Sequence, residues 1–141
     1  MNKLQTVQEI IKAWRAHDLD AVLDHVADDI EYHFLVGLKP LCGKSEMRSF
    51  LEKFGADQTD IRWRIVNAAE AGDILMVEGI DDYIDGKGRR IQTPYMGVFE
   101  FENGKVRAWR DYLDPALVKV DKIGEQQPEW VKALISRPAE V

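Results

Sequence analysis

The spacing of apolar residues changes along this chain from a helical period to a strand period. In the first 60 residues, apolar positions recur every three or four residues, which is typical of amphipathic helices. This spacing predicts one helix capped by Thr6, a shorter helix over residues 19–26, and a third over residues 45–55, capped by Ser45. A short strand over residues 30–34 is expected between the second and the third helix.

From residue 60 onward apolar residues alternate with polar ones, which predicts strands. We expect four strands that run as an antiparallel meander, over residues 61–69, 74–84, 89–101 and 106–113. The Asn-Gly pair between the last two is a strong hairpin signal. Three N-terminal helices and a curved antiparallel sheet predict an α+β domain, with the helices packed on one face of the sheet.

Composition and charge narrow the class of protein. The chain has 141 residues, of which 45% are hydrophobic, and its formal net charge is −6. An acidic chain is a poor match for nucleic acid or an anionic membrane. We expect neither as a partner, and no apolar run approaches the length of a membrane span. The absence of an apolar leader and the single cysteine, Cys42, favour a cytoplasmic location.

The chain has no internal linker before its last 20 residues. We therefore predict one pocket domain over residues 1–120, followed by a tail over residues 121–141 that contains helical turns. The tail is expected to act as a lid or as an interface segment, with Trp130 as its apolar anchor.

Asp111 is the first candidate for a functional side chain. On the predicted last strand it shares a face with Trp109 and Leu113, so it would point toward the core. A carboxylate among apolar neighbours is costly unless it is hydrogen-bonded or protonated.

A second candidate lies on the strand over residues 74–84, where Asp81 and Asp82 are adjacent. Adjacent strand residues face opposite ways, so one of these carboxylates points to the concave side of the sheet. We favour Asp81, because its face carries aliphatic residues and Gly79 leaves space beside the acid. The alternative is that either Asp81 or Asp82 is solvated near a strand end.

Aromatic residues on the following strand form a candidate pocket wall. Tyr95 and Phe99 share a face, which fits a pocket lining and also fits plain core packing. His33 on the short strand is either structural or a proton carrier beside the two acids. No spacing typical of a metal site or a phosphate-binding loop occurs, so we expect no metal and no cofactor.

The segments Ala27-Asp28-Asp29-Ile30-Glu31-Tyr32 and Asn103-Gly104-Lys105-Val106-Arg107-Ala108-Trp109-Arg110-Asp111-Tyr112-Leu113-Asp114, with the three helices, resemble the nuclear-transport-factor-2-like superfamily. Within it the chain is most similar to SnoaL-like polyketide cyclases and limonene epoxide hydrolases. The resemblance implies a cone-shaped α+β fold with a deep pocket on the concave face, and a homodimer.

The resemblance also implies roles for individual residues. Asp111 would lie at the pocket floor, Asp81 would be the second acid, and Tyr32 would position water. Two positions depart from the hydrolase pattern: Gly79 stands where the hydrolases have an arginine that bridges the acids, and Phe34 stands where they have an asparagine. The remaining residues expected to line the pocket are aromatic: Trp14, Trp63, Tyr83, Tyr95, Phe99 and Trp109.

The sequence thus favours a cofactor-free acid–base enzyme that isomerises or cyclises a small, apolar carbonyl or polyketide-like ligand. Two acids that share a proton suit the removal of a proton beside a carbonyl and its return elsewhere. One alternative is a diverged epoxide hydrolase in which Arg64 or Arg110 supplies the missing cation. The other is a ligand-binding or dimerisation domain without catalysis.

Overall fold

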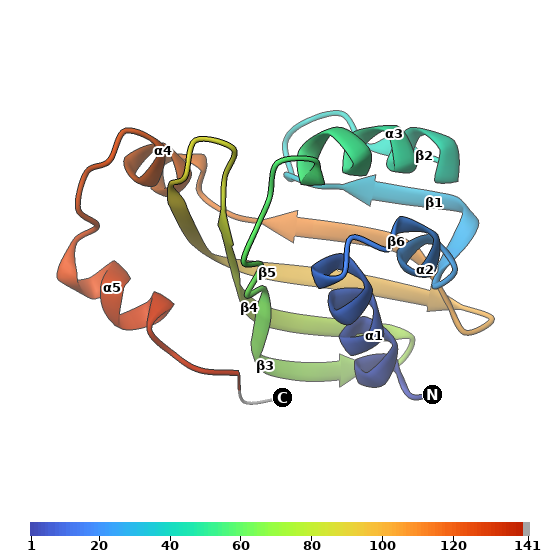
Figure 1. The fold of residues 1–141 in the computed structure, drawn as a ribbon. Helices are drawn as coiled ribbons and strands as arrows, with labels where there is room; N and C mark the ends of the chain where they lie inside the picture. The colour runs from blue at the N-terminus through green and yellow to red at the C-terminus, as the bar shows by residue number, and fades with distance from the viewer. Residues whose placement is uncertain (140–141) are drawn as a thin grey trace.

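A curved six-stranded sheet forms the centre of the computed structural model, which describes residues 1–139 (Figure 1). The strands are β1 (Val26–His33), β2 (Leu41–Cys42), β3 (Arg64–Ala71), β4 (Ile74–Ile84), β5 (Arg90–Glu102) and β6 (Lys105–Tyr112). The helices are α1 (Lys3–Arg15), α2 (Leu19–Leu23), α3 (Lys44–Gly55), α4 (Pro115–Lys122) and α5 (Glu129–Ile135).

The order of the strands across the sheet is β2-β1-β6-β5-β4-β3. Strands β3 to β6 pair antiparallel with their neighbours along the chain, which confirms the predicted meander. Strand β1 pairs with β6 in parallel, and β2 joins the edge of β1 antiparallel. The sheet is therefore mixed, and the α+β class is confirmed.

The helices are placed differently from the expected block of three at the N-terminus. Only α1 and α2 precede the first strand, and α3 follows β2. Val26, expected at the end of the second helix, begins β1 and is fully buried. The position of Val26 in the apolar pattern fits either the end of a helix or the start of a strand. Its pairing with Val106 of β6 places it in the sheet.

Helix caps also differ from the predicted ones. Asn2, rather than Thr6, caps α1: its side chain accepts from the amide of Gln5, whose own side chain accepts from the amide of Asn2. Thr6 lies inside the helix and donates to the Asn2 carbonyl oxygen. Gly43, rather than Ser45, precedes α3, and no side chain caps this helix.

The β5–β6 hairpin matches its sequence signal closely. Asn103 and Gly104 both have positive φ values, 53° and 77°, which is the backbone that a two-residue hairpin turn requires. The turn pairs Phe101 with Val106, and an irregularity between Glu100 and Phe101 then shifts the register so that Gly97 lies opposite Asp111. The hairpin therefore sets the position of the candidate acid on the sheet.

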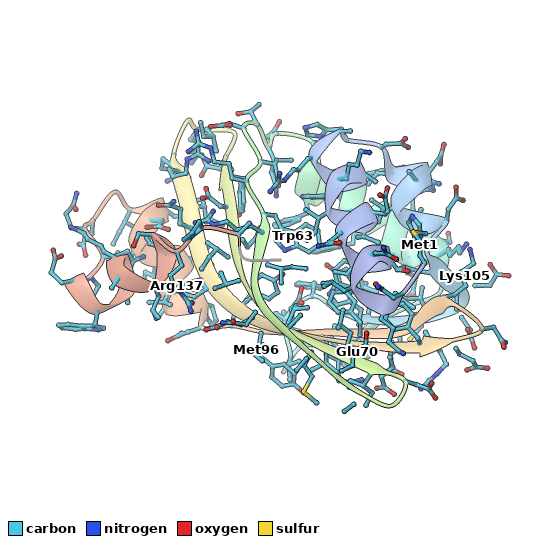
Figure 2. All side chains as sticks on the ribbon, turned by 90° about the horizontal axis from the view of Figure 1, so that it is seen from below. Met1, Trp63, Glu70, Met96, Lys105 and Arg137 are labelled. Carbon is cyan, nitrogen blue, oxygen red and sulfur yellow. The ribbon has the colours of Figure 1, made fainter. Side chains whose placement is uncertain are left out.

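The two faces of the sheet are covered by different elements. Helices α1, α2 and α3 lie over the concave inner face, where the main apolar core forms (Figure 1). Trp63 points into the space between this face and the helices, whereas Met96 points away from them (Figure 2). Helix α5 covers part of the outer face, where Val131 and Ile135 pack with Val66 and Ile80.

The tail divides between two places. Helix α4 follows β6 directly and lies at the end of the inner face, while α5 lies on the outer face (Figure 1). The Trp130 side chain, expected as an anchor, is exposed. Residues 140–141 of the predicted tail lie outside the described part of the chain. No helix within residues 1–139 is both long and apolar enough to cross a membrane.

Candidate active site

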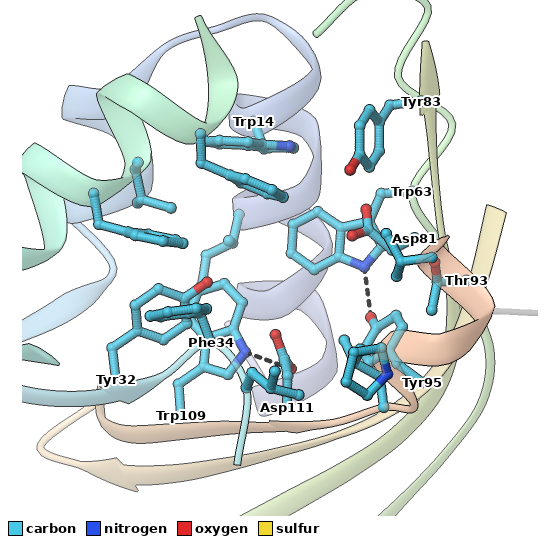
Figure 3. Close-up of a pocket in the computed structure, with 18 of the residues that line it drawn as sticks. Trp14, Tyr32, Phe34, Trp63, Asp81, Tyr83, Thr93, Tyr95, Trp109 and Asp111 are labelled. Atoms are coloured by element: carbon cyan, nitrogen blue, oxygen red, sulfur yellow. Dashed lines mark hydrogen bonds between the residues drawn. The ribbon is translucent and has the colours of Figure 1, made fainter. Parts of the chain in front are cut away.

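A cavity of about 480 Å³ lies between the inner face of the sheet and the helices that cover it (Figure 3). Its walls are mostly aromatic and aliphatic, and α4 forms part of its rim. Aromatic rings stack along one wall, with Phe34 and Phe50 centred 4.1 Å apart. The lining residues predicted from the sequence and found there are Trp14, Tyr32, Phe34, Trp63, Asp81, Tyr83, Tyr95, Trp109 and Asp111.

The structure brings Asp81 and Asp111 into this one cavity from two different strands (Figure 3). Asp81 comes from β4, opposite Thr93 on β5, and Asp111 comes from β6, opposite Gly97. Protein atoms surround each carboxyl, and the cavity is the space that both reach. A Cβ atom on Gly97 would lie 3.1 Å from Asp111 Oδ1, so glycine leaves the carboxylate room.

Both carboxyls hold their protons more tightly than an ordinary aspartic acid. Burial raises the pKa of Asp81 to about 7, and the nearby charge of Asp82 adds to this shift. Burial raises the pKa of Asp111 to about 8, to which the charge of Asp81 also contributes. The Trp109 indole N–H donates to Asp111 Oδ1 at 3.0 Å and opposes that shift, because it stabilises the carboxylate.

Two buried tyrosines face the acid pair. Burial raises the pKa of the Tyr32 and Tyr95 hydroxyls well above the usual value, and the charges of Asp111 and Asp81 raise it further. Both therefore stay protonated and act as hydrogen-bond donors. The Tyr95 oxygen accepts a hydrogen bond from the Trp63 indole N–H, which leaves the Tyr95 proton available to another acceptor (Figure 3).

Thr93 is a polar lining residue that the sequence analysis did not select. Its side chain is 2% exposed, it lies opposite Asp81, and its Oγ1 has no hydrogen-bond partner among the described residues. A buried hydroxyl without a partner carries a desolvation cost. The signal available in the sequence was its position two residues from Tyr95 on the same face of the strand.

Gly79 does not line the cavity, and its position explains how Tyr95 fits there. The two residues are opposite one another on β4 and β5. A Cβ atom on Gly79 would lie 2.7 Å from the Tyr95 hydroxyl oxygen and 2.6 Å from the Arg64 carbonyl oxygen. Tyr95 therefore fills the space that any side chain at position 79 would need.

Asp82 occupies the opposite face of the sheet and is not solvated, so the alternative reading of this residue is wrong. It is 1% exposed, and its carboxylate accepts from Arg64 at 2.8 Å and Arg90 at 2.9 Å. A third donor, the Gln92 amide, lies 3.0 Å away. The outer face supplies both the cations and the hydrogen bonds that a buried carboxylate needs.

Neither arginine proposed to replace the missing cation lies in the cavity. Arg64 donates to Asp82 and to carbonyl oxygens of the tail on the outer face. Arg110 forms an ion pair with Glu100. The hypothesis that Arg64 or Arg110 supplies the missing cation is therefore wrong. Successive residues on a strand face opposite sides of the sheet, and both arginines point away from the side that carries the acids.

Two other predicted lining residues also lie off the cavity. The His33 ring points to the face opposite Tyr32, and its Nε2 lies 2.7 Å from Glu31 Oε1, so it is not beside the acids. Phe99 is fully buried and packs on Trp109, with ring centres 4.8 Å apart. Phe99 therefore belongs to the core beneath the cavity lining, as the core-packing alternative for this residue predicted.

The arrangement is suited to proton transfer in a dry, apolar space. Two carboxyls with raised pKa values provide one proton donor and one acceptor near neutral pH, and hydroxyl groups surround them. Within residues 1–139, no group of three or more His, Cys, Asp or Glu side chains is placed to hold a metal ion.

Comparison with known proteins agrees with this fold and cavity. The chain is 28% identical over 108 residues to epoxide hydrolase EphG of Mycobacterium tuberculosis, covering 77% of this chain and 70% of that protein. A solved M. tuberculosis LEH-like epoxide hydrolase is 26% identical, with a TM-score of 0.73 over 93% of this chain and 92% of the other.

A SnoaL-like polyketide cyclase structure from Shewanella denitrificans has a TM-score of 0.78 at 15% identity, over 86% of this chain and 97% of the other, and so shares the fold. These neighbours confirm the nuclear-transport-factor-2-like fold. The family model described as the limonene-1,2-epoxide hydrolase catalytic domain matches residues 1–120, and the chain belongs to that family.

Proposed function

We propose that the protein is a cofactor-independent acid–base enzyme in which Asp81 and Asp111 exchange protons with a small, largely apolar ligand. One observation carries the proposal: the two carboxyls share an apolar cavity, and no described arginine or lysine forms an ion pair with either. Such a pair cannot lose both protons cheaply. One carboxyl then acts as the acid while the other acts as the base.

The reaction that these residues support best is the relocation of a proton next to a carbonyl group. The ionised carboxyl removes a proton from the carbon beside the carbonyl, and electron density moves to the carbonyl oxygen. The protonated carboxyl then returns a proton to a different carbon of the enolate. Isomerisation and aldol-type cyclisation both begin with this enolisation, and acid–base catalysis of this kind contributes about 10²–10⁴-fold.

Tyr95 and Thr93 are the groups we assign to the substrate oxygen. The Tyr95 hydroxyl already accepts from Trp63 and so has its proton to donate, and the Thr93 hydroxyl has no partner in the described chain. Neutral donors fixed in an apolar site stabilise a developing oxyanion without reorganising. Both residues come from β5, where Thr93 lies opposite Asp81.

Epoxide hydrolysis is the second candidate, favoured by the family and by the similarity to EphG. A water held by Tyr32 and one carboxylate would attack an epoxide carbon and give up a proton to that carboxylate. The other carboxyl would protonate the oxygen as the carbon–oxygen bond breaks, which yields a diol. Phe34 and Gly79 stand where the hydrolase pattern has a second water ligand and a cation, so this reaction has fewer supporting groups here.

A panel of substrates separates the two reactions. Small cyclic and unsaturated ketones are incubated with the protein in D₂O, and NMR follows the exchange of protons beside the carbonyl. Matching epoxides are assayed for diol in parallel. We expect exchange with ketones, and a loss of about 10²-fold or more in Asp111→Asn and Asp81→Asn.

Asp28→Asn is the matched control, since the Asp28 carboxylate is exposed and forms only a surface ion pair with Lys44. It should keep wild-type activity. Diol formation without ketone exchange would assign the protein to the second candidate. Activity on neither panel, or activity that survives both cavity substitutions, would contradict the proposed acid pair.

Three expectations from the sequence stay predictions. These are the homodimer, the cytoplasmic location and the division into a pocket domain and a tail. Sedimentation velocity on the full chain tests the first directly, since a dimer of this 16.2 kDa chain is easily separated from the monomer.

A further inference from the structure

Two lysines line the cavity from α4, which forms part of its rim. Lys119 and Lys122 belong to α4, and both are cavity-lining residues with exposed side chains. They are three residues apart on the helix, so their side chains lie on one face. Val118, which also lines the cavity, places an apolar contact beside them.

Neither ammonium group has an acidic partner within residues 1–139. Two nearby acids, Asp121 and Asp85, accept hydrogen bonds from other residues. Asp121 accepts from the Gln92 amide and from the Gln127 side chain, and Asp85 accepts from Arg89. The two lysines therefore carry ammonium groups without an ion-pair partner among the described residues, on a protein whose net charge is −6.

The β4–β5 turn holds this end of α4 in place. The Arg89 guanidinium donates to the backbone carbonyl oxygen of Lys122 while it pairs with Asp85. The contact uses the Lys122 backbone and leaves its side chain free. The rim is thus attached to the strands that carry Asp81 and Thr93.

The charges along the cavity have opposite signs at its two ends. The rim carries two ammonium groups, and the interior carries two carboxyls, so an anion is attracted to the rim and repelled from the interior. The lining also includes apolar side chains such as Leu113, Val118 and Phe54. A ligand with an apolar body and one anionic end can satisfy this arrangement in a single orientation.

We infer that the cavity takes an amphiphilic anion, bound with its carboxylate or phosphate between Lys119 and Lys122 and with its apolar body directed toward Asp81 and Asp111. The inference deepens the proposed function, on which it rests, by naming the substrate class of the same cavity. Reaction then takes place on the apolar body, at a carbon or oxygen remote from the anionic group. A neutral ligand of equal length gains no such orientation.

Ligand binding tests the inference without any need for turnover. Affinities of the full chain for octanoate, octyl phosphate and 1-octanol are measured by isothermal titration calorimetry at pH 7 and low ionic strength. We expect the anions to bind about 3- to 30-fold more tightly than the alcohol, given the energies typical of two exposed ion pairs. The preference should shrink in 0.5 M salt, at a Debye length of about 4 Å.

Paired substitutions identify the groups responsible. Lys119→Met with Lys122→Met should abolish the preference for the anions and leave 1-octanol affinity within about twofold. Lys12→Met with Lys53→Met changes the net charge equally at lysines off the cavity lining, and should keep the preference. Tighter binding of octyl phosphate than of octanoate would identify the phosphate as the better match, and the reverse order the carboxylate.

Equal affinity of the wild-type protein for octanoate and 1-octanol would overturn the inference, as would a preference that survives in the Lys119 and Lys122 double variant. The Asp81→Asn, Asp111→Asn protein separates this inference from the proposed function. It should bind octanoate at least as tightly as wild type, because the interior repulsion is removed. Intact anion preference in a wild-type protein that shows no exchange activity contradicts the proposed function alone.

Discussion

Asp81 and Asp82 are neighbours in the chain and have opposite surroundings on the two faces of one sheet. On the outer face, Asp82 is bonded to Arg64, Arg90 and the Gln92 amide. On the inner face, Asp81 meets an apolar cavity and a second acid, Asp111. The outer face stabilises its buried charge, whereas the inner face leaves the charge uncompensated.

This difference separates a structural carboxylate from a reactive one. A carboxylate paired with two guanidinium groups contributes to the fold, since removing it would leave both cations without their partner. A carboxylate without a cation in an apolar cavity keeps its proton to higher pH, as the pKa values of about 7 and 8 for Asp81 and Asp111 indicate. Acids enclosed by the fold are found on both faces, so enclosure alone does not mark the site. The absence of an ion-pair partner does.

The largest effect is expected from removing the outer carboxylate. Asp82→Ala leaves Arg64 and Arg90 without their shared partner, and should lower the free energy of unfolding by about 3 kcal/mol. Urea denaturation measures the loss. Asp28→Ala, which removes an exposed acid, should change stability by less than about 0.5 kcal/mol. A loss below about 1 kcal/mol for Asp82→Ala would mean that the outer face does not depend on this ion pair.

Removing the two inner acids should raise the free energy of unfolding, in contrast to removing Asp82, and the size of this effect should depend on pH. A carboxyl whose pKa is raised in the folded state favours folding below its unfolded pKa of about 3.9 and loses that advantage as pH rises toward 7 and 8. Because both folded pKa values lie well above 5, the folded protein holds more protons than the unfolded chain across this range, and the wild-type protein should lose about 3 kcal/mol or more between pH 5 and pH 7.

The Asp81→Asn, Asp111→Asn variant should lack this loss and be more stable than wild type at pH 8. Thermal unfolding across pH 4 to 8 measures both proteins. Parallel pH profiles for the two would contradict raised pKa values on the inner face. A variant that is less stable at pH 8 would instead mean that the acids contribute to the fold as Asp82 does.

Gly79→Ala tests how tightly the inner face is filled beside the acids. The added Cβ would lie 2.6 Å from a backbone oxygen, Arg64 O, and 2.7 Å from Tyr95, so the strands must shift. We expect a loss of about 1–3 kcal/mol in urea denaturation, and a displaced Tyr95 ring. Wild-type stability would show that the site can accommodate a side chain at position 79.

Thr93→Val should give the smallest effect. It removes a buried hydroxyl without a partner, and should raise the free energy of unfolding by about 1 kcal/mol. Thr6→Val is the matched comparison, because the buried Thr6 hydroxyl donates to the Asn2 carbonyl oxygen and its removal should be destabilising. Destabilisation by both substitutions would mean that Thr93 has a structural partner.

The sequence predicted the sheet well because its strands alternate clearly and their turns carry Asn-Gly or Gly signals. It could not place β1 beside β6, since a parallel pair between segments 70 or more residues apart leaves no local signal. The two-residue strand β2 is too short to produce a pattern. Helix caps were missed where two polar residues compete, as Asn2 and Thr6 do.

Within the site, strand parity and the family resemblance together selected both acids and most aromatic lining residues. The alternation of side chains alone could not decide which of Asp81 and Asp82 faces the cavity. The arginines that distinguish the two acids come from the neighbouring strands β3 and β5. Lys119 and Lys122 were missed because their place at the rim depends on where α4 packs, which periodicity does not encode. His33 was expected beside the acids, but the alternation of side chains along β1 places its ring on the face opposite Tyr32, next to Glu31.

The central claim is that the cavity acids retain a shared proton near neutral pH, and NMR titration of their carboxyl carbons tests it most directly. Chemical shifts of Asp81 and Asp111 are followed from pH 3 to 9, and each is assigned from the corresponding Asn variant. We predict apparent pKa values far above the ordinary ~3.9, with the pKa of Asp111 lowered in Asp81→Asn because the repulsion between the two charges is removed. Two titrations complete below pH 5 would contradict the account.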